Sequence, residues 1–413
     1  MARDERQQLA GAAEMGFDPE RLARIPGFLQ ERYVGPGLLP GVQLLVAREG
    51  RPVHFTTLGI ARAGSAEPLG EDAIFRIASM TKPITSLAFM MLVEEGRVSL
   101  DQPVHDVIGE FRNLRVYDGG GAGSPFRTVA PERPMLMIDL LRHTSGLTYD
   151  FQYRTNVDAA YRERGILTLR GKLSLEEFVG RLGEVPLEFS PGTAWNYSVS
   201  TDVLGLVVER LAGMKFEDFL AQRIFAPLGM DDTFFHVPAD KLHRLTDAWA
   251  LTEDRGTIVY DKGHGGTWSR PPALVSGGGG LASTTADYHR FCRMLLNGGE
   301  LEGVRLVGRK TLDLMQANHL PGNADLTELS RSMFSEAIYS GQGFGLGFGI
   351  NMSPAKAMAP GSAGEYYWGG IFSTYFFVDP VERVSMIFMT QLMPSSSYAV
   401  RRQLKTMVYA ALS

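Results

Sequence analysis

The segment Phe75-Arg-Ile-Ala-Ser-Met-Thr-Lys82 contains a Ser-x-x-Lys tetrad, formed by Ser79 and Lys82. Apolar residues follow at helical spacing as far as Gly96, so the tetrad is predicted to open a helix. Residues three apart on a helix lie about 5–6 Å apart at Cβ, which brings the lysine amine within reach of the serine hydroxyl. Because a serine hydroxyl is a weak nucleophile until a base takes its proton, this spacing favours an activated serine.

A second Ser-x-x-Lys tetrad occurs at Ser353–Lys356, so the tetrad by itself is not specific. It lies in a predicted loop at 351–364, where we expect the helical geometry to be lacking. In contrast, Pro83 falls in the first turn of the helix after Ser79, where its missing N–H costs little. Taken alone, the first tetrad is equally compatible with a plain helix cap followed by a solvated lysine.

Strand patterns come from both ends of the chain and helical patterns from its middle. The predicted strands are Gly41–Arg48 and Val53–Leu58, joined by a hairpin turn at Glu49-Gly50-Arg51, and the β-rich runs Tyr366–Asp379 and Val384–Thr390. The predicted helices include residues 20–32, interrupted at Pro26-Gly27, a helix capped by Ser174, a helix ending at Gly213, and the terminal stretch Tyr398–Leu412.

This order predicts an α/β fold of the α+β type, in which one antiparallel sheet is flanked by helices and carries an inserted, mostly helical subdomain. Residues 1–100 and 280–413 would form the sheet subdomain, and residues 101–279 the helical one. We expect the active site in the cleft between them, where ligand sites usually lie.

The bulk composition excludes several classes of partner. The 413 residues are 44% hydrophobic and 21% charged with a net charge of -5, which gives no reason to expect nucleic acid or an anionic membrane as partner. The single cysteine, Cys292, excludes an internal disulfide and is predicted to be a buried structural thiol. The N-terminal residues lack the apolar core of a secretory signal and no run of 18 apolar residues exists, so a cytoplasmic location is expected. The sequence does not indicate an oligomeric state.

Several segments together resemble the class C β-lactamases, the penicillin-binding proteins and the esterases related to them, over roughly residues 20 to 410. Beside the Ser79 segment, the matching stretches are Leu140–Leu147, Pro191–Ser198, Phe225–Met230, Gly277–Thr284 and Trp368-Gly369-Gly370.

The resemblance implies a role for individual residues. Ser79 would attack the carbonyl carbon and become acylated, and Tyr197 would share with Lys82 the task of accepting the serine proton. Either of the two could be the acceptor, since neighbours can lower the pKa of a phenol or an amine. The N–H groups of Ser79 and Ile371 would bind the oxyanion. No cofactor and no metal is implied, and His143 is expected to be structural.

Two departures separate this chain from the β-lactamases. The Tyr-x-Asn motif reads Tyr197-Ser-Val199 here, so the amide that contacts the antibiotic is missing. The Lys-Thr-Gly motif is replaced by Trp368-Gly369-Gly370, which is similar to the carboxylesterases of family VIII and favours an apolar acyl or alcohol group. We also expect Tyr149 to line the acyl pocket.

These features predict a carboxylic ester hydrolase that acts on small or short-chain acyl esters through an acyl-enzyme. Three alternatives stay open: an acyltransferase of the same fold, a β-lactamase or D-amino-acid peptidase, and a non-catalytic binding protein. The Gly-x-Ser-x-Gly signature of α/β-hydrolases is absent. The glycine cluster at 119–123 lacks the lysine of a phosphate-binding loop and is predicted to be a flexible loop.

Overall fold

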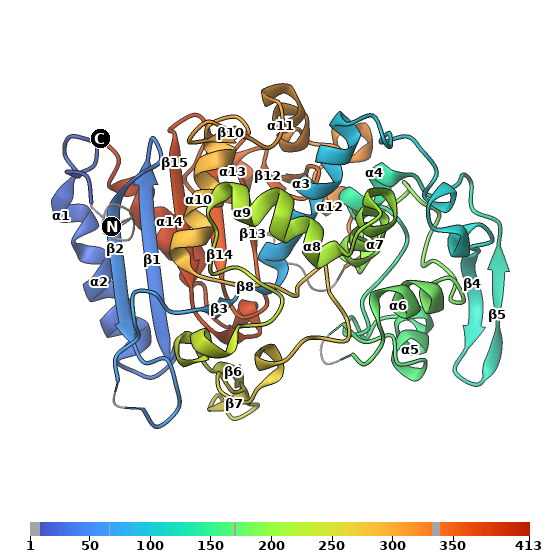
Figure 1. Ribbon diagram of the computed structural model, residues 1–413, viewed down its shortest axis with the longest axis horizontal. Helices are drawn as coiled ribbons and strands as arrows, with labels where there is room; N and C mark the ends of the chain where they lie inside the picture. The colour runs from blue at the N-terminus through green and yellow to red at the C-terminus, as the bar shows by residue number, and fades with distance from the viewer. Residues whose placement is uncertain (1–8, 66, 169–170, 333–338) are drawn as a thin grey trace.

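The computed structural model describes residues 9–65, 67–168, 171–332 and 339–413. At its centre lies a seven-stranded sheet in which all neighbouring strands are antiparallel (Figure 1). The strands, in spatial order, are β11 (Gln342–Phe344), β12 (Gly349–Asn351), β13 (Tyr366–Gly369), β14 (Tyr375–Asp379), β15 (Val384–Met389), β1 (Gly41–Arg48) and β2 (Arg51–Gly59). The predicted joining of both chain ends in one sheet is confirmed by the pairing of β1 with β15.

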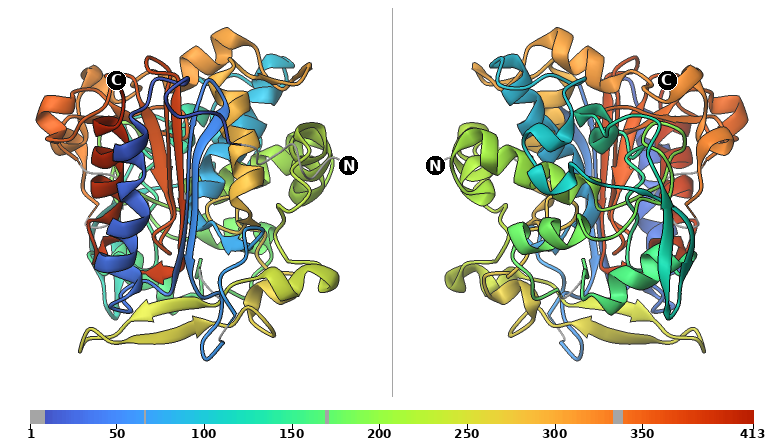
Figure 2. Two further views of the ribbon diagram at one scale, coloured as in Figure 1. Left: turned by 90° about the vertical axis from the view of Figure 1, so that its left-hand side faces the viewer. Right: turned by 90° about the vertical axis from the view of Figure 1, so that its right-hand side faces the viewer.

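Side chains alternate between two apolar layers along each central strand, as a pleated sheet requires. Leu44 and Val46 of β1 pack on one side with helices α1 (Pro19–Leu22), α2 (Arg24–Leu29) and α14 (Val400–Ala410). Leu45 and Ala47 face the opposite side, in the core that contains α3 (Thr81–Glu94) and α10 (Thr285–Leu296). Figure 2 shows the sheet edge-on between these two groups of helices.

The middle of the chain forms a mostly helical part beside α3 (Figure 1). Its helices are α4 (Met137–Leu141), α5 (Asn156–Glu163), α6 (Leu175–Leu182), α7 (Ser200–Ala212), α8 (Phe216–Leu220) and α9 (Ala226–Leu228). The predicted cap of α6 is present, because the Ser174 hydroxyl accepts from the Glu177 N–H at 3.2 Å. The predicted end of α7 is present as well, with Gly213 in the left-handed conformation at φ 68°.

The remaining elements are short or peripheral: β3 (Phe75–Arg76), β4 (Val116–Gly121), β5 (Ser124–Val129), β6 (Ala248–Leu251), β7 (Thr257–Asp261), β8 (Ala282–Ser283), β9 (Glu300–Leu301), β10 (Val304–Arg305), α11 (Arg309–Gln316), α12 (Leu326–Leu329), α13 (Pro354–Ala357) and β16 (Leu392–Met393). Cys292 is buried within α10, as predicted. In the described part of the chain, helices of the length and apolarity needed to cross a bilayer are absent.

Three local predictions were wrong. The break in the first helical segment falls at Ala23, because Pro26 lies in the first turn of α2, where no N–H is needed. The glycine cluster at 119–123 is not a loop: Gly119–Gly121 belong to β4 and pair with β5 in a hairpin. The loop predicted around the second tetrad contains the short helix α13, capped by Ser353.

Candidate active site

Ser79 lies in a tight turn directly before α3. A 3₁₀ turn, Ala78–Met80, precedes the first residue of the helix, and Ala78 adopts a left-handed conformation with φ 45°. The turn is fixed on one side by the pairing of β3 with β8 and on the other by the Thr374 hydroxyl, which donates to the Ile77 carbonyl at 3.2 Å. A strained, well-supported turn of this kind is common where a side chain must be aimed at a ligand.

The Ser79 hydroxyl contacts two potential proton acceptors at once. Its Oγ lies 2.6 Å from the Tyr197 hydroxyl and 3.1 Å from Lys82 Nζ. Lys82 also donates to the Gly278 carbonyl at 2.6 Å, and both Lys82 and Tyr197 are 1% exposed. A nucleophile in hydrogen-bond contact with a possible base is the arrangement that covalent catalysis requires.

Aromatic rings surround the Lys82 ammonium. Nζ lies 4.6 Å from the ring centroid of Tyr197 and 5.4 Å from that of Tyr149. Tyr149 also hydrogen-bonds to Tyr197, and burial raises the pKa of Tyr149 well above its usual value, which keeps it protonated. Burial, followed by the Lys82 charge, lowers the pKa of His143 well below its usual value. His143 packs against the Tyr197 ring at 5.1 Å and stays neutral, so it supports the site rather than serving as a charged group.

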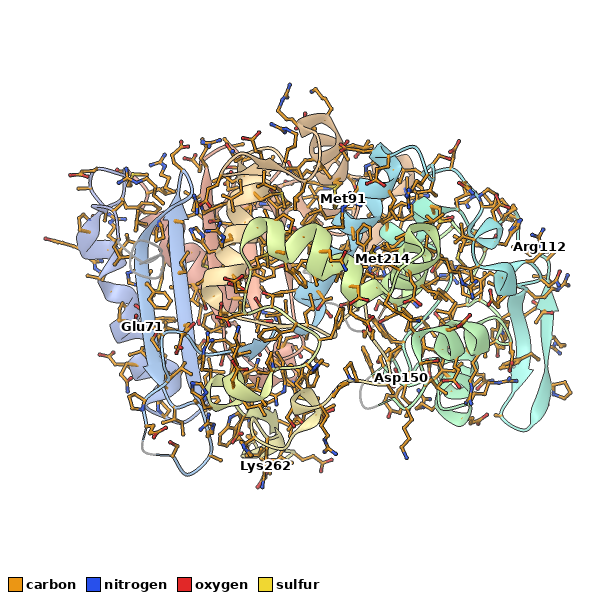
Figure 3. All side chains as sticks on the ribbon, in the orientation of Figure 1. Glu71, Met91, Arg112, Asp150, Met214 and Lys262 are labelled. Carbon is orange, nitrogen blue, oxygen red and sulfur yellow. The ribbon has the colours of Figure 1, made fainter. Side chains whose placement is uncertain are left out.

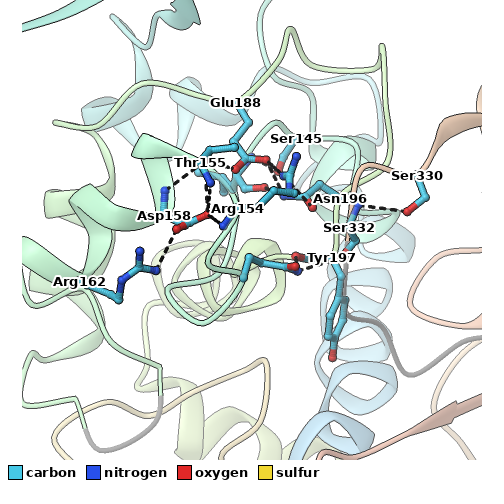
Figure 4. A network of polar contacts seen from close by, with 12 residues as sticks. Ser145, Arg154, Thr155, Asp158, Arg162, Glu188, Asn196, Tyr197, Ser330 and Ser332 are labelled. Atoms are coloured by element: carbon cyan, nitrogen blue, oxygen red, sulfur yellow. Dashed lines mark hydrogen bonds and ion pairs between the residues drawn. The ribbon is translucent and has the colours of Figure 1, made fainter. Parts of the chain in front are cut away.

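A buried polar network holds the chain on either side of Tyr197 (Figure 4). Glu188 accepts from the Asn196 amide at 3.1 Å and from the Thr155 hydroxyl at 2.7 Å, and it forms an ion pair with Arg154. The Gln152 amide donates to the Tyr197 carbonyl at 3.2 Å. These contacts fix the chain at Asn196 and at the Tyr197 carbonyl, and so they fix the position of the Tyr197 phenol.

The turn between β13 and β14 approaches Ser79 closely because it contains glycine. A Cβ on Gly370 would lie 2.5 Å from the Ile77 carbonyl oxygen and 2.4 Å from the Thr374 hydroxyl. Arg401 of α14 fixes this turn by donating to the Gly370 carbonyl at 2.6 Å and to the Thr374 carbonyl at 2.7 Å. Within the described residues, no hydrogen bond uses the N–H of Ser79 or Ile371.

A cavity of about 360 Å³ opens beside Ser79. Its wall is mainly apolar and includes a few polar groups, as is typical of small-molecule sites. The apolar lining residues include Phe151, Phe235, Trp268, Pro272, Leu274 and Ile371. Thr168 also lines this cavity and is held by Asp150, whose side chain is labelled in Figure 3; the Thr168 hydroxyl donates to Asp150 at 2.8 Å. The described residues include no group of three His, Cys, Asp or Glu side chains placed to hold a metal ion.

The structure brings some predicted site residues to the cavity and keeps others away from it. Ser79, Tyr197, Tyr149 and Ile371 line the cavity. The side chain of Trp368, which we expected among the substrate-binding residues, does not: it is 0% exposed and packs against the Tyr197 ring at 5.5 Å.

Val199, Gly369 and Gly370 do not line the cavity either. The Val199 side chain is 1% exposed and belongs to the apolar core. Its N–H donates to the Thr148 carbonyl directly before α7. Gly369 leaves room for the Arg401 guanidinium, which a Cβ would meet at 2.8 Å. The two glycines allow the close approach of the backbone that the sequence suggested.

Sequence reasoning missed two polar groups of the site, Asp202 and Gly278. Asp202 lies in the first turn of α7 and lines the cavity, although it is 0% exposed. Gly278 holds the Lys82 amine, as described above. The available signal was an acidic residue directly before the apolar run 203–208.

Comparison with known proteins identifies the family of the chain. The family model described as Beta-lactamase matches residues 31–409. The chain belongs to the β-lactamase family. Esterase EstB of Burkholderia gladioli is 32% identical to it over 371 residues, which cover 85% of this chain and 86% of EstB. Protein Rv1367c of Mycobacterium tuberculosis is 33% identical over 364 residues, covering 87% of this chain and 88% of that protein.

Among solved structures, EstCE1, "a hydrolase with promiscuous acyltransferase activity", superposes with a TM-score of 0.78 and 25% identity, covering 94% of this chain and 99% of EstCE1. The predicted relationship to β-lactamase-like serine hydrolases, and to the esterases among them, is confirmed by this family match and these relatives.

Proposed function

We propose that this member of the β-lactamase family is a carboxylesterase that forms an acyl-enzyme on Ser79. Ser79 Oγ attacks the ester carbonyl while its proton passes to the Lys82–Tyr197 pair, and the Ser79 and Ile371 N–H groups donate hydrogen bonds to the oxyanion. The pair then returns the proton to the departing alkoxide. Water, activated by the same pair, hydrolyses the acyl-enzyme and frees the acid.

The observation that carries this proposal is the pair of contacts at Ser79 Oγ, 2.6 Å to Tyr197 and 3.1 Å to Lys82, at the wall of an apolar cavity. A cavity of about 360 Å³ suits a small or short-chain acyl ester. The positions that supply an amide and a lysine to β-lactam antibiotics in β-lactamases hold buried Val199 and Trp368 here. These replacements favour esters over β-lactams.

The experiment compares kcat/KM for nitrophenyl esters of increasing acyl length with kcat/KM for a chromogenic cephalosporin, under identical conditions. We expect the best short-chain ester to exceed the cephalosporin by about 10⁴-fold, which is the scale of discrimination when a polar partner is missing. The Ser79→Ala variant serves as the blank. An equal or higher value for the cephalosporin would replace the esterase assignment by that of a β-lactamase.

Transfer of the acyl group to an alcohol is the second candidate, and the relationship to EstCE1 favours it. Both activities share the acyl-enzyme and differ in the acceptor that attacks it. With a short-chain vinyl ester and a primary alcohol in water, product analysis separates the two. A hydrolase yields mainly the acid, and an acyltransferase yields mainly the new ester at millimolar alcohol.

A further inference from the structure

Asp202 is a buried carboxylate at the base of the active-site cavity, five residues after Tyr197 in the chain. Its Oδ1 accepts from the Ser276 hydroxyl and, at 3.1 Å, from the Gly278 N–H. Its Oδ2 is buried and has no hydrogen-bond partner among the described residues. Burying a carboxylate oxygen without a hydrogen-bond partner costs free energy unless a nearby charge compensates it.

The Gly278 backbone connects Asp202 to Lys82. The N–H of this residue donates to Asp202, and its carbonyl accepts from Lys82 Nζ at 2.6 Å. The contact requires glycine, since a Cβ at this position would lie 2.5 Å from Asp202 Oδ2. The preceding carbonyl, of Gly277, accepts from the Thr85 hydroxyl of α3 at 2.8 Å. The Gly277–Gly278 segment, which orients the Lys82 amine, is therefore anchored by the carboxyl group of Asp202 and by the neutral hydroxyl of Thr85.

The titratable groups around Lys82 come from several elements. Tyr197 and Tyr149 lie on the loops before α7 and after α4, His143 on the turn after α4, and Asp202 on α7. Burial keeps Tyr149 protonated and His143 neutral. Burial, the largest cause, leaves the pKa of Asp202 above its usual value, although the Lys82 charge and the hydrogen bonds from Ser276 and Gly278 lower it. The Lys82 charge therefore acts directly on this carboxyl group.

We propose that Asp202 is a positioning residue for the Lys82–Tyr197 pair, which holds the Lys82 amine through Gly278 and balances its positive charge. This inference rests on the proposed role of Ser79 as nucleophile. The Asp202 side chain makes two contributions. Its hydrogen bond to the Gly278 N–H fixes the position of the Lys82 amine. Its charge sets the pH at which the Lys82–Tyr197 pair loses a proton and can then act as a base.

The test uses covalent labelling of Ser79 by a fluorescent fluorophosphonate, which does not depend on any ester being turned over. In this reaction the Ser79 Oγ–P bond forms, the P–F bond breaks, fluoride leaves, and the hydroxyl proton passes to the Lys82–Tyr197 pair. The second-order labelling rate is measured from pH 5 to 10 for the wild type and for the Asp202→Asn, Asp202→Ala and Thr85→Val variants, with Ser79→Ala as the blank. Where an ester is turned over, kcat/KM is measured over the same pH range.

Removing a negative charge beside Lys82 disfavours the protonated pair, so the active form appears at lower pH. We expect the rising limb of the rate in Asp202→Asn to move down by about one pH unit, since a nearby opposite charge shifts a pKa by about 1–3 units. Asp202→Ala also loses the anchor of Gly278, and its maximal rate should fall about tenfold below that of Asp202→Asn. Thr85→Val removes a neutral anchor of the same segment and should leave the limb in place.

An unmoved limb in Asp202→Asn, or an equal shift in Thr85→Val, would overturn the proposal. Failure of both Asp202 variants to fold, judged by circular dichroism and melting, would assign Asp202 to fold stability alone and overturn it as well. If the wild type is labelled but turns over no ester, the proposed esterase function is contradicted, and the labelling rates still test the positioning role of Asp202. A wild type that is neither labelled nor active on esters would remove both proposals.

Discussion

The two Ser-x-x-Lys tetrads of this chain have the same residue types at the same spacing and different surroundings. Ser79 lies in a turn before a buried helix, and its Oγ contacts both Lys82 and Tyr197. Ser353 caps the four-residue helix α13, where its hydroxyl accepts from the Lys356 N–H at 3.3 Å. The side chain of Lys356 is 66% exposed and lies 3.7 Å from Asp325. One serine is positioned for chemistry, and the other satisfies the end of a helix.

The difference lies in the partners that come from elsewhere in the chain. Tyr197 is 118 residues from Ser79, and Gly278 is 196 residues from Lys82. In the second tetrad, the exposed Lys356 forms an ion pair with Asp325 at 3.7 Å, which water screens on the lysine side. A short motif becomes a catalytic group only where the tertiary fold buries its lysine and supplies a second polar partner for its serine.

The largest expected effect is that of removing each serine in turn. Ser79→Ala should lower kcat/KM for a nitrophenyl ester by about 10⁴-fold or more, because no acyl-enzyme can form. The matched change Ser353→Ala should leave kcat/KM within about twofold of the wild type, since α13 does not line the cavity. Both variants should keep the wild-type circular dichroism spectrum. Similar losses in the two variants would contradict the assignment of the nucleophile.

The two groups that contact Ser79 should behave as one unit. Lys82→Ala and Tyr197→Phe should each lower kcat by about 10³-fold, and the double variant should be little worse than either, because residues that act together are strongly non-additive. Lys356→Ala, the control from the second tetrad, should have no effect on kcat. Losses that multiply in the double variant would indicate that the two side chains act independently.

A smaller effect is expected from Gly370→Ala, which tests the close approach of the β13–β14 turn to Ser79. The added Cβ would collide with the Ile77 carbonyl, so we expect about 1–3 kcal/mol lower stability and about a tenfold lower kcat as the Ile371 N–H moves away. Gly180→Ala in α6 is the control, because its Cβ would meet nothing within 4 Å. Thermal melting and ester kinetics measure both quantities. Wild-type values for Gly370→Ala would show that the turn does not depend on glycine.

Sequence patterns predicted the elements whose cause is local. The strand at Gly41–Arg48, the capping box at Ser174 and the end of α7 at Gly213 depend on neighbouring residues and were confirmed. Two predictions were wrong: that the helix breaks at Pro26, and that the glycine cluster at 119–123 forms a loop. A proline fits the first turn of a helix as well as a break, and glycines with positive φ fit a twisted hairpin as well as a loop.

For the candidate site, the sequence predicted Ser79, Lys82 and Tyr197 as the reacting groups, through the tetrad and through the resemblance to known motifs. The surroundings of these three residues became known only from the folded structure. It placed Trp368 behind Tyr197 instead of in the cavity, and it brought Asp202 and Gly278 to the lysine amine. Burial and charge compensation depend on contacts between segments that are distant in the chain, and a local sequence pattern does not specify those contacts.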